Sequence, residues 1–191
     1  MSDTKNSWEN ILKLLKAIPN NSCYDVNAPA TTREIKSLEE KIGIKLPDSF
    51  KEYLSVSDGQ KDQFSHALIG YMNFFDISTI IEVWSNMVDE FDGDIIDWKT
   101  EDKIKPVIWD KGWIPFTSNG GGSNMMVLDM APGKNGTVGQ IFLWHPGLGD
   151  EDEITADSFE ECSVGLLSRL TNKEYTISDL GVISFNDYYF V

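Results

Sequence analysis

The chain has 191 residues, 41% of them hydrophobic, and its 31 acidic and 16 basic side chains give a formal net charge of −15. This length and apolar content suit one domain with an ordinary core, and they exclude disorder along the whole chain. The charge disfavours nucleic acid and anionic membranes as partners and favours neutral or basic ones, although such acidity also serves solubility alone.

Three helices are expected in the first 60 residues. Ser7 is a candidate cap for the first helix, which a proline terminates. Thr31-x-x-Glu34 is a capping box that starts a second helix, and Gly43 suits its C-terminal stop. A Leu-Pro-Asp sequence at 46–48 opens a short third helix, because proline is tolerated in the first turn.

The following segment leads from aromatic residues into a fourth helix. Residues 64–77 are aromatic and indicate strand and loop. Thr79-x-x-Glu82 is another capping box, so a helix is expected to run to about Glu90. Its buried stripe should contain Ile80, Val83, Trp84 and Met87. Residues 89–105 are charged and contain glycine, which indicates a loop.

From residue 106 the pattern changes to short apolar runs separated by turn-forming residues. Strands are expected at 107–109, 114–116, 125–128 and 138–144. Tight turns between consecutive strands predict an antiparallel meander. A last helix is expected over about 158–170, and the tail after it is a candidate edge strand.

Helices, then consecutive strands, then a helix is the order of an α+β protein. We therefore predict a mostly antiparallel sheet packed against several helices. A core domain is expected over residues 30–174, residues 1–29 add a helix and a loop to the same domain, and residues 175–191 form a C-terminal tail.

The lack of a recognisable signal peptide and the spacing of the cysteines suggest a compartment. The apolar run at 11–18 is interrupted by lysines, so it is no signal peptide, and no stretch has the length of a membrane span. Cys23 and Cys162 lie far apart and show no metal-binding spacing, which leaves one disulfide as the alternative to two thiols. We expect a cytoplasmic protein with reduced thiols.

No residue pattern indicates catalysis. His66 and His145 are the only histidines, and neither lies in a catalytic or zinc-binding motif. The glycines at 120–122 are followed by Ser123 and a strand-like run, not by the Gly-Lys-Ser/Thr of a phosphate loop, so they indicate a turn. We expect no enzyme activity, no metal and no cofactor.

Two acidic stretches are the candidate partner-binding residues. The denser stretch, at 150–161, has seven acids and no lysine or arginine, and the first turn of the last helix explains only those from Asp157 onward. The unexplained four are Asp150, Glu151, Asp152 and Glu153. Adjacent carboxylates repel one another, and a basic partner would relieve that repulsion and speed association. Solvation alone is the equal alternative.

The second stretch contains Asp89, Glu90, Asp92, Asp94 and Asp97. A solvated loop or a partner surface suits it better than a calcium site, because the residue order of an EF-hand is not met. Trp98 and Trp144 are candidate aromatic anchors beside charged or turn segments, with core packing as the favoured alternative.

A series of short motifs runs through residues 30–170. It consists of LPDSFKEYL at 46–54, Asp58-Gly59, WIPF at 113–116, NGGGS at 119–123, VLDM at 127–130, Pro132, and GTVGQI at 136–141. Each motif alone is weak, but their order resembles the SUKH superfamily, the Smi/Knr family. Ser123 departs from the pattern, since many members carry Asp there. Trp113 and Phe116 are expected in the core, and Asp129 should accept hydrogen bonds from nearby backbone donors.

The resemblance implies an α+β domain that binds a protein and has no catalytic residues. In bacteria such proteins are commonly immunity proteins that block a polymorphic toxin, often a nuclease or a deaminase. Fungal relatives regulate cell-wall synthesis and carry long disordered flanks, which this sequence lacks. The expected partner is therefore a basic toxin domain whose active site the acidic residues occlude. The alternatives are a regulator or scaffold that binds a cellular protein and, less favoured, a carboxylate-based metal enzyme.

Overall fold

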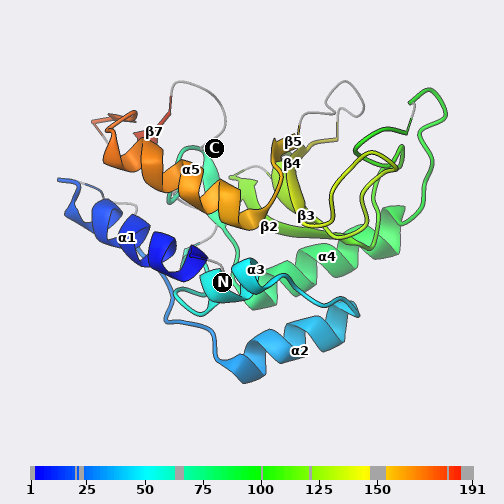
Figure 1. Ribbon diagram of the computed structural model, residues 1–191, viewed down its shortest axis with the longest axis horizontal. Coiled ribbons are helices and arrows are strands. Elements are labelled where there is room, and N and C mark those ends of the chain that lie inside the picture. The colour runs from blue at the N-terminus through cyan, green and yellow to red at the C-terminus, as the bar shows by residue number, and fades with distance from the viewer. Residues whose placement is uncertain are drawn as a thin grey trace.

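The computed structural model of the chain describes residues 3–19, 21, 24–62, 67–99, 101–120, 122–146, 154–179 and 181–185. Figure 1 shows how the helices and strands of these residues are arranged. In chain order they are α1 (Thr4–Ala17), α2 (Thr32–Ile42), α3 (Asp48–Leu54), β1 (Met72–Phe74), α4 (Ile77–Phe91), β2 (Trp113–Asn119), β3 (Met125–Asp129), β4 (Gln140–Trp144), β5 (Ile154–Ala156), α5 (Phe159–Thr171), β6 (Thr176–Ile177) and β7 (Ile183–Ser184).

The centre of the molecule is a five-stranded sheet in the order β1-β2-β3-β4-β5. Each strand pairs antiparallel with the next one in the sequence. The β3–β4 register runs from Met125 opposite Trp144 to Asp129 opposite Gln140. The α+β class and the predicted meander are thus confirmed.

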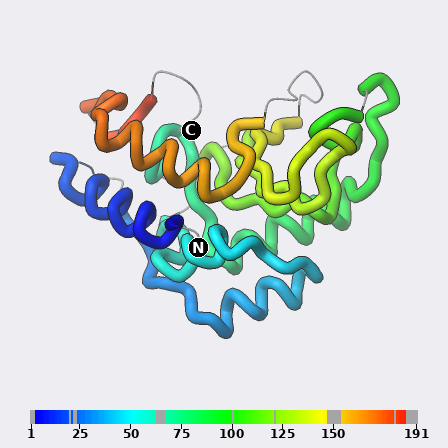
Figure 2. Tube along the Cα trace, viewed as in Figure 1, coloured from blue at the N-terminus to red at the C-terminus, as the bar shows by residue number. Residues whose placement is uncertain are grey.

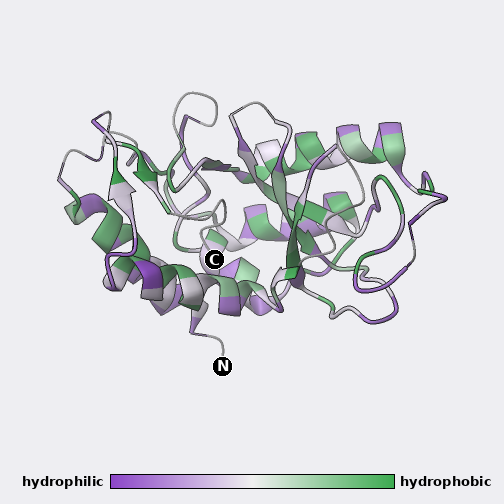
Figure 3. Ribbon diagram, turned by 90° about the horizontal axis from the view of Figure 1, so that it is seen from above, coloured by the Kyte–Doolittle hydropathy of each residue, from purple (hydrophilic) through white to green (hydrophobic). Residues whose placement is uncertain are grey.

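Both faces of the sheet are covered, because successive side chains of a strand point to opposite faces. One face joins the core that α1, α3 and α5 share, through Ile114, Phe116, Met126, Leu128, Ile141 and Leu143. The other face packs against α4 and the loop after it, through Trp113, Met125, Val127, Phe142 and Trp144. Figure 3 shows the strands mostly green, while the helices alternate green and purple, as expected for helices with one buried face.

An aromatic cluster holds the helices of the first face together. Trp8 lies 4.6 Å from Tyr53 between ring centroids, and Phe50 lies 4.9 Å from Phe159. The Trp8 indole N–H also donates a hydrogen bond of 2.9 Å to Ser163 Oγ of α5. Helices α1 and α5, from distant parts of the chain, therefore lie side by side (Figure 2).

Helix starts follow the predictions only in part. The capping box at Thr31 is confirmed, with both reciprocal hydrogen bonds present. The prediction for Ser7 is wrong, because α1 already begins at its N-cap, Asp3, and Ser7 is buried inside the helix. The prediction for Thr79 is also wrong, since the Asp76 carboxylate accepts the Thr79 N–H at 2.8 Å and is itself the cap of α4.

The structure also differs from the strand predictions. Residues 107–109 form only isolated bridges with the loop after α4, at Ile95–Val107 and Asp92–Trp109. Strand β5 was not predicted. After α5, β6 and β7 pair with each other in a separate two-stranded sheet, so the described part of the tail adds no edge strand to the five-stranded sheet.

The motif residues support the fold. Trp113 and Phe116 are buried, which confirms the prediction for them. Asp129 is fully buried, and its carboxylate accepts hydrogen bonds of 2.9 Å from the Ala131 N–H and from the Gln140 side chain. Its expected role as an acceptor for nearby donors is therefore confirmed. Burial raises the pKa of Asp129 to about 6, against the lowering effect of these two hydrogen bonds.

This raised pKa predicts a fold that is more stable at pH 5 than at pH 7.5. Unfolded aspartates titrate near 4, so the unfolded chain loses the proton first, and the stabilisation is present below pH 4 and lost as pH rises through 6. Between pH 5 and pH 7.5 Asp129 should account for about 1.4 kcal/mol of this loss, because part of its stabilisation is already lost below pH 5. Asp58 contributes in the same direction, since burial raises its pKa to about 6.

Chemical unfolding at the two pH values measures the difference. Asp129→Asn, which cannot titrate, should make the free energies of unfolding at pH 5 and pH 7.5 more alike. A wild-type free energy of unfolding that rises from pH 5 to pH 7.5 would contradict this prediction. Below pH 4 the trend should reverse, because Glu39 opposes it. Burial raises the pKa of Glu39, but hydrogen bonds from Lys45 and the Leu46 N–H outweigh this and lower it.

Candidate functional site

The C-terminal end of α4 and the loop after it carry a group of exposed carboxylates, here called the α4 acidic end. Its members are Asp89, Glu90, Asp92, Asp94 and Asp97, all of them exposed. The last turn of α4 contains no basic residue. A helix C-terminus carries partial negative charge, so acids there destabilise the helix where lysine or arginine would stabilise it.

Neighbouring cations do not neutralise this group. In the described part of the chain, none of the five acids forms an ion pair, although pairs occur elsewhere, such as Lys36–Glu40 and Lys105–Asp110. Among the described residues, the negative charge at this helix end is therefore not offset by ion pairs, and Asp92 is the member of the group whose carboxylate also accepts a backbone hydrogen bond within the fold.

The backbone below these acids is held in place. Asp92 Oδ1 accepts the Lys111 N–H at 2.8 Å, the Gly93 N–H donates to the Trp109 carbonyl at 3.0 Å, and the Ile108 N–H donates to the Asp94 carbonyl at 2.8 Å. The Ile96 N–H donates to the Pro106 carbonyl at 2.8 Å, and the Ile96 side chain is buried. Exposed side chains thus stand on a loop with fixed anchor points, which reduces the entropy lost when a partner binds.

Two large apolar side chains are exposed within the same loop. Trp98 is 65% exposed and Ile95 is 70% exposed. Trp98 belongs to the predicted anchors, whereas sequence reasoning missed Ile95, because its burial depends on a loop conformation that no periodicity encodes. Trp144 is only 8% exposed, and its indole N–H donates to the Ile108 carbonyl at 2.8 Å. It occupies a core position beside this loop.

Four of the predicted partner-binding acids fall outside the residues that the structure describes. Asp150, Glu151, Asp152 and Glu153 lie outside the described residues, as do His66 and Cys23. Cys162 is a buried free thiol, and burial raises its pKa to about 12. Among the described residues, no group of three or more His, Cys, Asp or Glu side chains is arranged to hold a metal ion.

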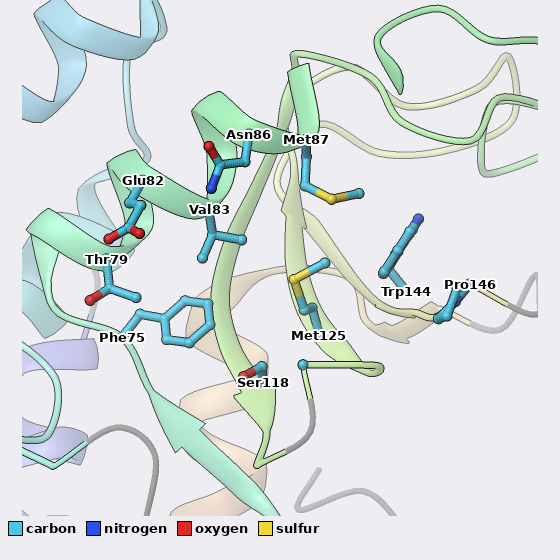
Figure 4. Close-up of a pocket in the computed structure, with 11 residues that line it drawn as sticks. Phe75, Thr79, Glu82, Val83, Asn86, Met87, Ser118, Met125, Trp144 and Pro146 are labelled. Atoms are coloured by element: carbon cyan, nitrogen blue, oxygen red, sulfur yellow. The ribbon is translucent and has the colours of Figure 1, made fainter. Parts of the chain in front are cut away.

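A cavity of about 460 Å³ lies between α4 and the sheet (Figure 4). Its walls are the apolar side chains Phe75, Val83, Met87, Met125, Trp144 and Pro146. Figure 4 shows Val83 and Met87 extending from α4 toward Met125 on β3. Val83, Trp84 and Met87 were expected to be buried, but all three are only half-buried. Val83 and Met87 line this cavity, whereas the Trp84 indole N–H donates to the Lys111 carbonyl at 2.9 Å. No residue pattern indicated this cavity.

The described helices are all too short or too polar to span a bilayer.

Comparison with known proteins identifies the family. The SMI1 / KNR4 family (SUKH-1) matches residues 29–162, which span the second helix through the first turns of α5. A comparison with curated proteins gives no match. The match covers more than half of the chain and includes every motif on which the resemblance rests. The chain therefore belongs to the SMI1 / KNR4 family (SUKH-1).

Proposed function

We propose that this chain is an immunity protein, which binds a cognate bacterial toxin of the nuclease or deaminase type and occludes its active site. It acts by binding and not by catalysis. Family membership supports a protein-binding role, because immunity proteins are common in this family. The partner follows from the chemistry of the α4 acidic end.

The observation that carries the proposal is the negative charge at the C-terminal end of α4, which no ion pair among the described residues offsets. Asp89 and Glu90 oppose the dipole of α4, and no ion pair among the described residues offsets them. Such charge is explained by a basic partner surface. A toxin that acts on nucleic acid needs a basic groove for phosphates, and exposed carboxylates on a fixed backbone fill such a groove as phosphate mimics.

Apolar anchors beside the charges add affinity. Aromatic side chains that become buried dominate the energetics of many interfaces. Trp98 is 65% exposed beside the exposed Asp97, and the exposed Ile95 lies in the same loop. The proposed partner-binding set further includes Asp150, Glu151, Asp152 and Glu153. Replacing these four acids with lysines should weaken toxin binding and reduce the salt dependence of the affinity. Trp144 belongs to this set through its edge at the cavity.

Co-expression with a toxin domain encoded beside the gene of this chain tests the proposal. The chain is expected to restore growth, and the purified pair should form a 1:1 complex that abolishes nuclease or deaminase activity and weakens from low to high salt. A toxin of the same chemistry from an unrelated system is the control and should not be blocked. A complex that leaves the toxin fully active would contradict occlusion. If the chain instead captures only a housekeeping complex from a cell lysate, the alternative function, a regulator that binds a cellular protein, would be favoured.

A further inference from the structure

The cavity beside α4 has the chemistry of a pocket for one bulky side chain. Its apolar walls include two methionines, whose flexible thioethers adapt to differently shaped ligands. Polar groups are confined to Thr79, Glu82 and Asn86 of α4 and to Ser118 of β2. A volume of about 460 Å³ lies in the range of small-molecule pockets and is more than enough for one large aromatic or aliphatic side chain.

The charge around this pocket selects the occupant. Glu82 is exposed at the rim, and no lysine, arginine or histidine is among the described residues that line the pocket. Residues three and four apart share a helix face, so the stripe formed by Glu82, Val83 and Asn86 continues into Asp89 and Glu90. One side of α4 therefore presents an apolar pocket first and the α4 acidic end one turn later.

We propose that this pocket takes a bulky apolar side chain, aromatic or aliphatic, from a basic segment of a partner protein. The proposal rests on the proposed function and adds the second half of the recognition surface, in which the carboxylates bind lysines or arginines that flank the anchoring side chain. A second copy of this chain is disfavoured as the occupant, because it would bring more negative charge toward Glu82, Asp89 and Glu90.

Short peptides test the pocket without the toxin. The ¹⁵N-labelled chain is titrated with acetyl-Lys-Lys-Trp-Lys-Lys-amide while amide and methionine methyl signals are recorded. We expect saturable shifts at Val83, Met87 and Met125, none with glycine in place of tryptophan, and much weaker ones when glutamates replace the lysines. Equal binding of the glycine peptide, equal binding of the glutamate peptide, or shifts confined to other parts of the chain would overturn the proposal.

Two variants sharpen the test. Val83→Trp should fill the pocket and abolish the shifts, whereas Val164→Trp, the same change at an exposed site on α5, should leave them intact. Should Val83→Trp not fold, Glu82→Lys at the exposed rim should weaken the lysine peptide about fivefold. Unchanged binding by a folded Val83→Trp, or by Glu82→Lys, would overturn the proposal. A toxin that is still blocked by such a variant would leave the proposed function standing and remove only the pocket.

Discussion

The double substitution Asp89→Lys/Glu90→Lys is expected to weaken toxin binding about tenfold to a hundredfold while making the protein harder to unfold. Each reversal removes an attraction to a basic partner and adds a repulsion. The same lysines complement the negative end of the α4 dipole, whose last turn now has no basic residue, and should raise the free energy of unfolding by about 1 kcal/mol. Binding and stability therefore move in opposite directions.

This opposition separates a functional role from a structural one. The matched control is Glu9→Lys/Asp179→Lys, which changes the net charge by the same amount at two other exposed sites. Titration calorimetry at two salt concentrations measures affinity, and urea unfolding measures stability. The control should change the affinity only about twofold to threefold, through long-range attraction. Equal losses of affinity for both variants would show that only the net charge of the protein matters for binding. Unchanged affinity for both variants would show that the α4 acidic end is not part of the interface.

The sequence was sufficient for the parts of the fold that follow from local rules. The helical stripes, the capping box at Thr31 and the short apolar runs of β2, β3 and β4 between turn-forming residues are decided by neighbours a few residues apart. The exposed acids of the α4 acidic end were also found, because a dense run of like charges is solvated wherever it lies. The order of these elements then predicted the α+β class, and the family motifs agreed with it.

The predictions failed where contacts between distant segments of the chain determine the structure. Asp58 Oδ1 accepts the Ile77 N–H at 2.9 Å, and the Phe75 N–H pairs with the Phe116 carbonyl, so the chain stays extended to Asp76 and α4 starts there and not at Thr79. The capping-box pattern therefore placed the cap three residues too late, at Thr79 instead of Asp76. The cavity was missed for the same reason, since its walls come from α4, β3 and β4, and only their packing leaves it open.

A further contact invisible in the sequence should have the largest effect on stability. Gln60 is 2% exposed, and its side chain lies against β1, the edge strand of the sheet. Its Oε1 accepts hydrogen bonds from the Leu68 N–H at 3.2 Å and the Phe74 N–H at 2.9 Å, and its Nε2 donates to the Asp62 carbonyl at 2.6 Å. This side chain thus satisfies one N–H group of the edge strand and one of the segment before it.

Gln60→Met, which keeps the length of the side chain, should lower the free energy of unfolding by roughly 2–5 kcal/mol, because two buried N–H groups lose their acceptor. Gln60→Glu keeps the acceptor but places a carboxylate against the Asp62 carbonyl. Burial and this contact should raise the pKa of the new glutamate. At low pH the protonated carboxyl can donate to the Asp62 carbonyl in place of Nε2, so the variant protein keeps its stability. This stability is lost as pH rises through the raised pKa. Urea unfolding at pH 5 and pH 7.5 should therefore show Gln60→Glu close to wild type only at pH 5 and Gln60→Met destabilised at both. A Gln60→Met variant as stable as wild type would show that other groups satisfy the edge of β1.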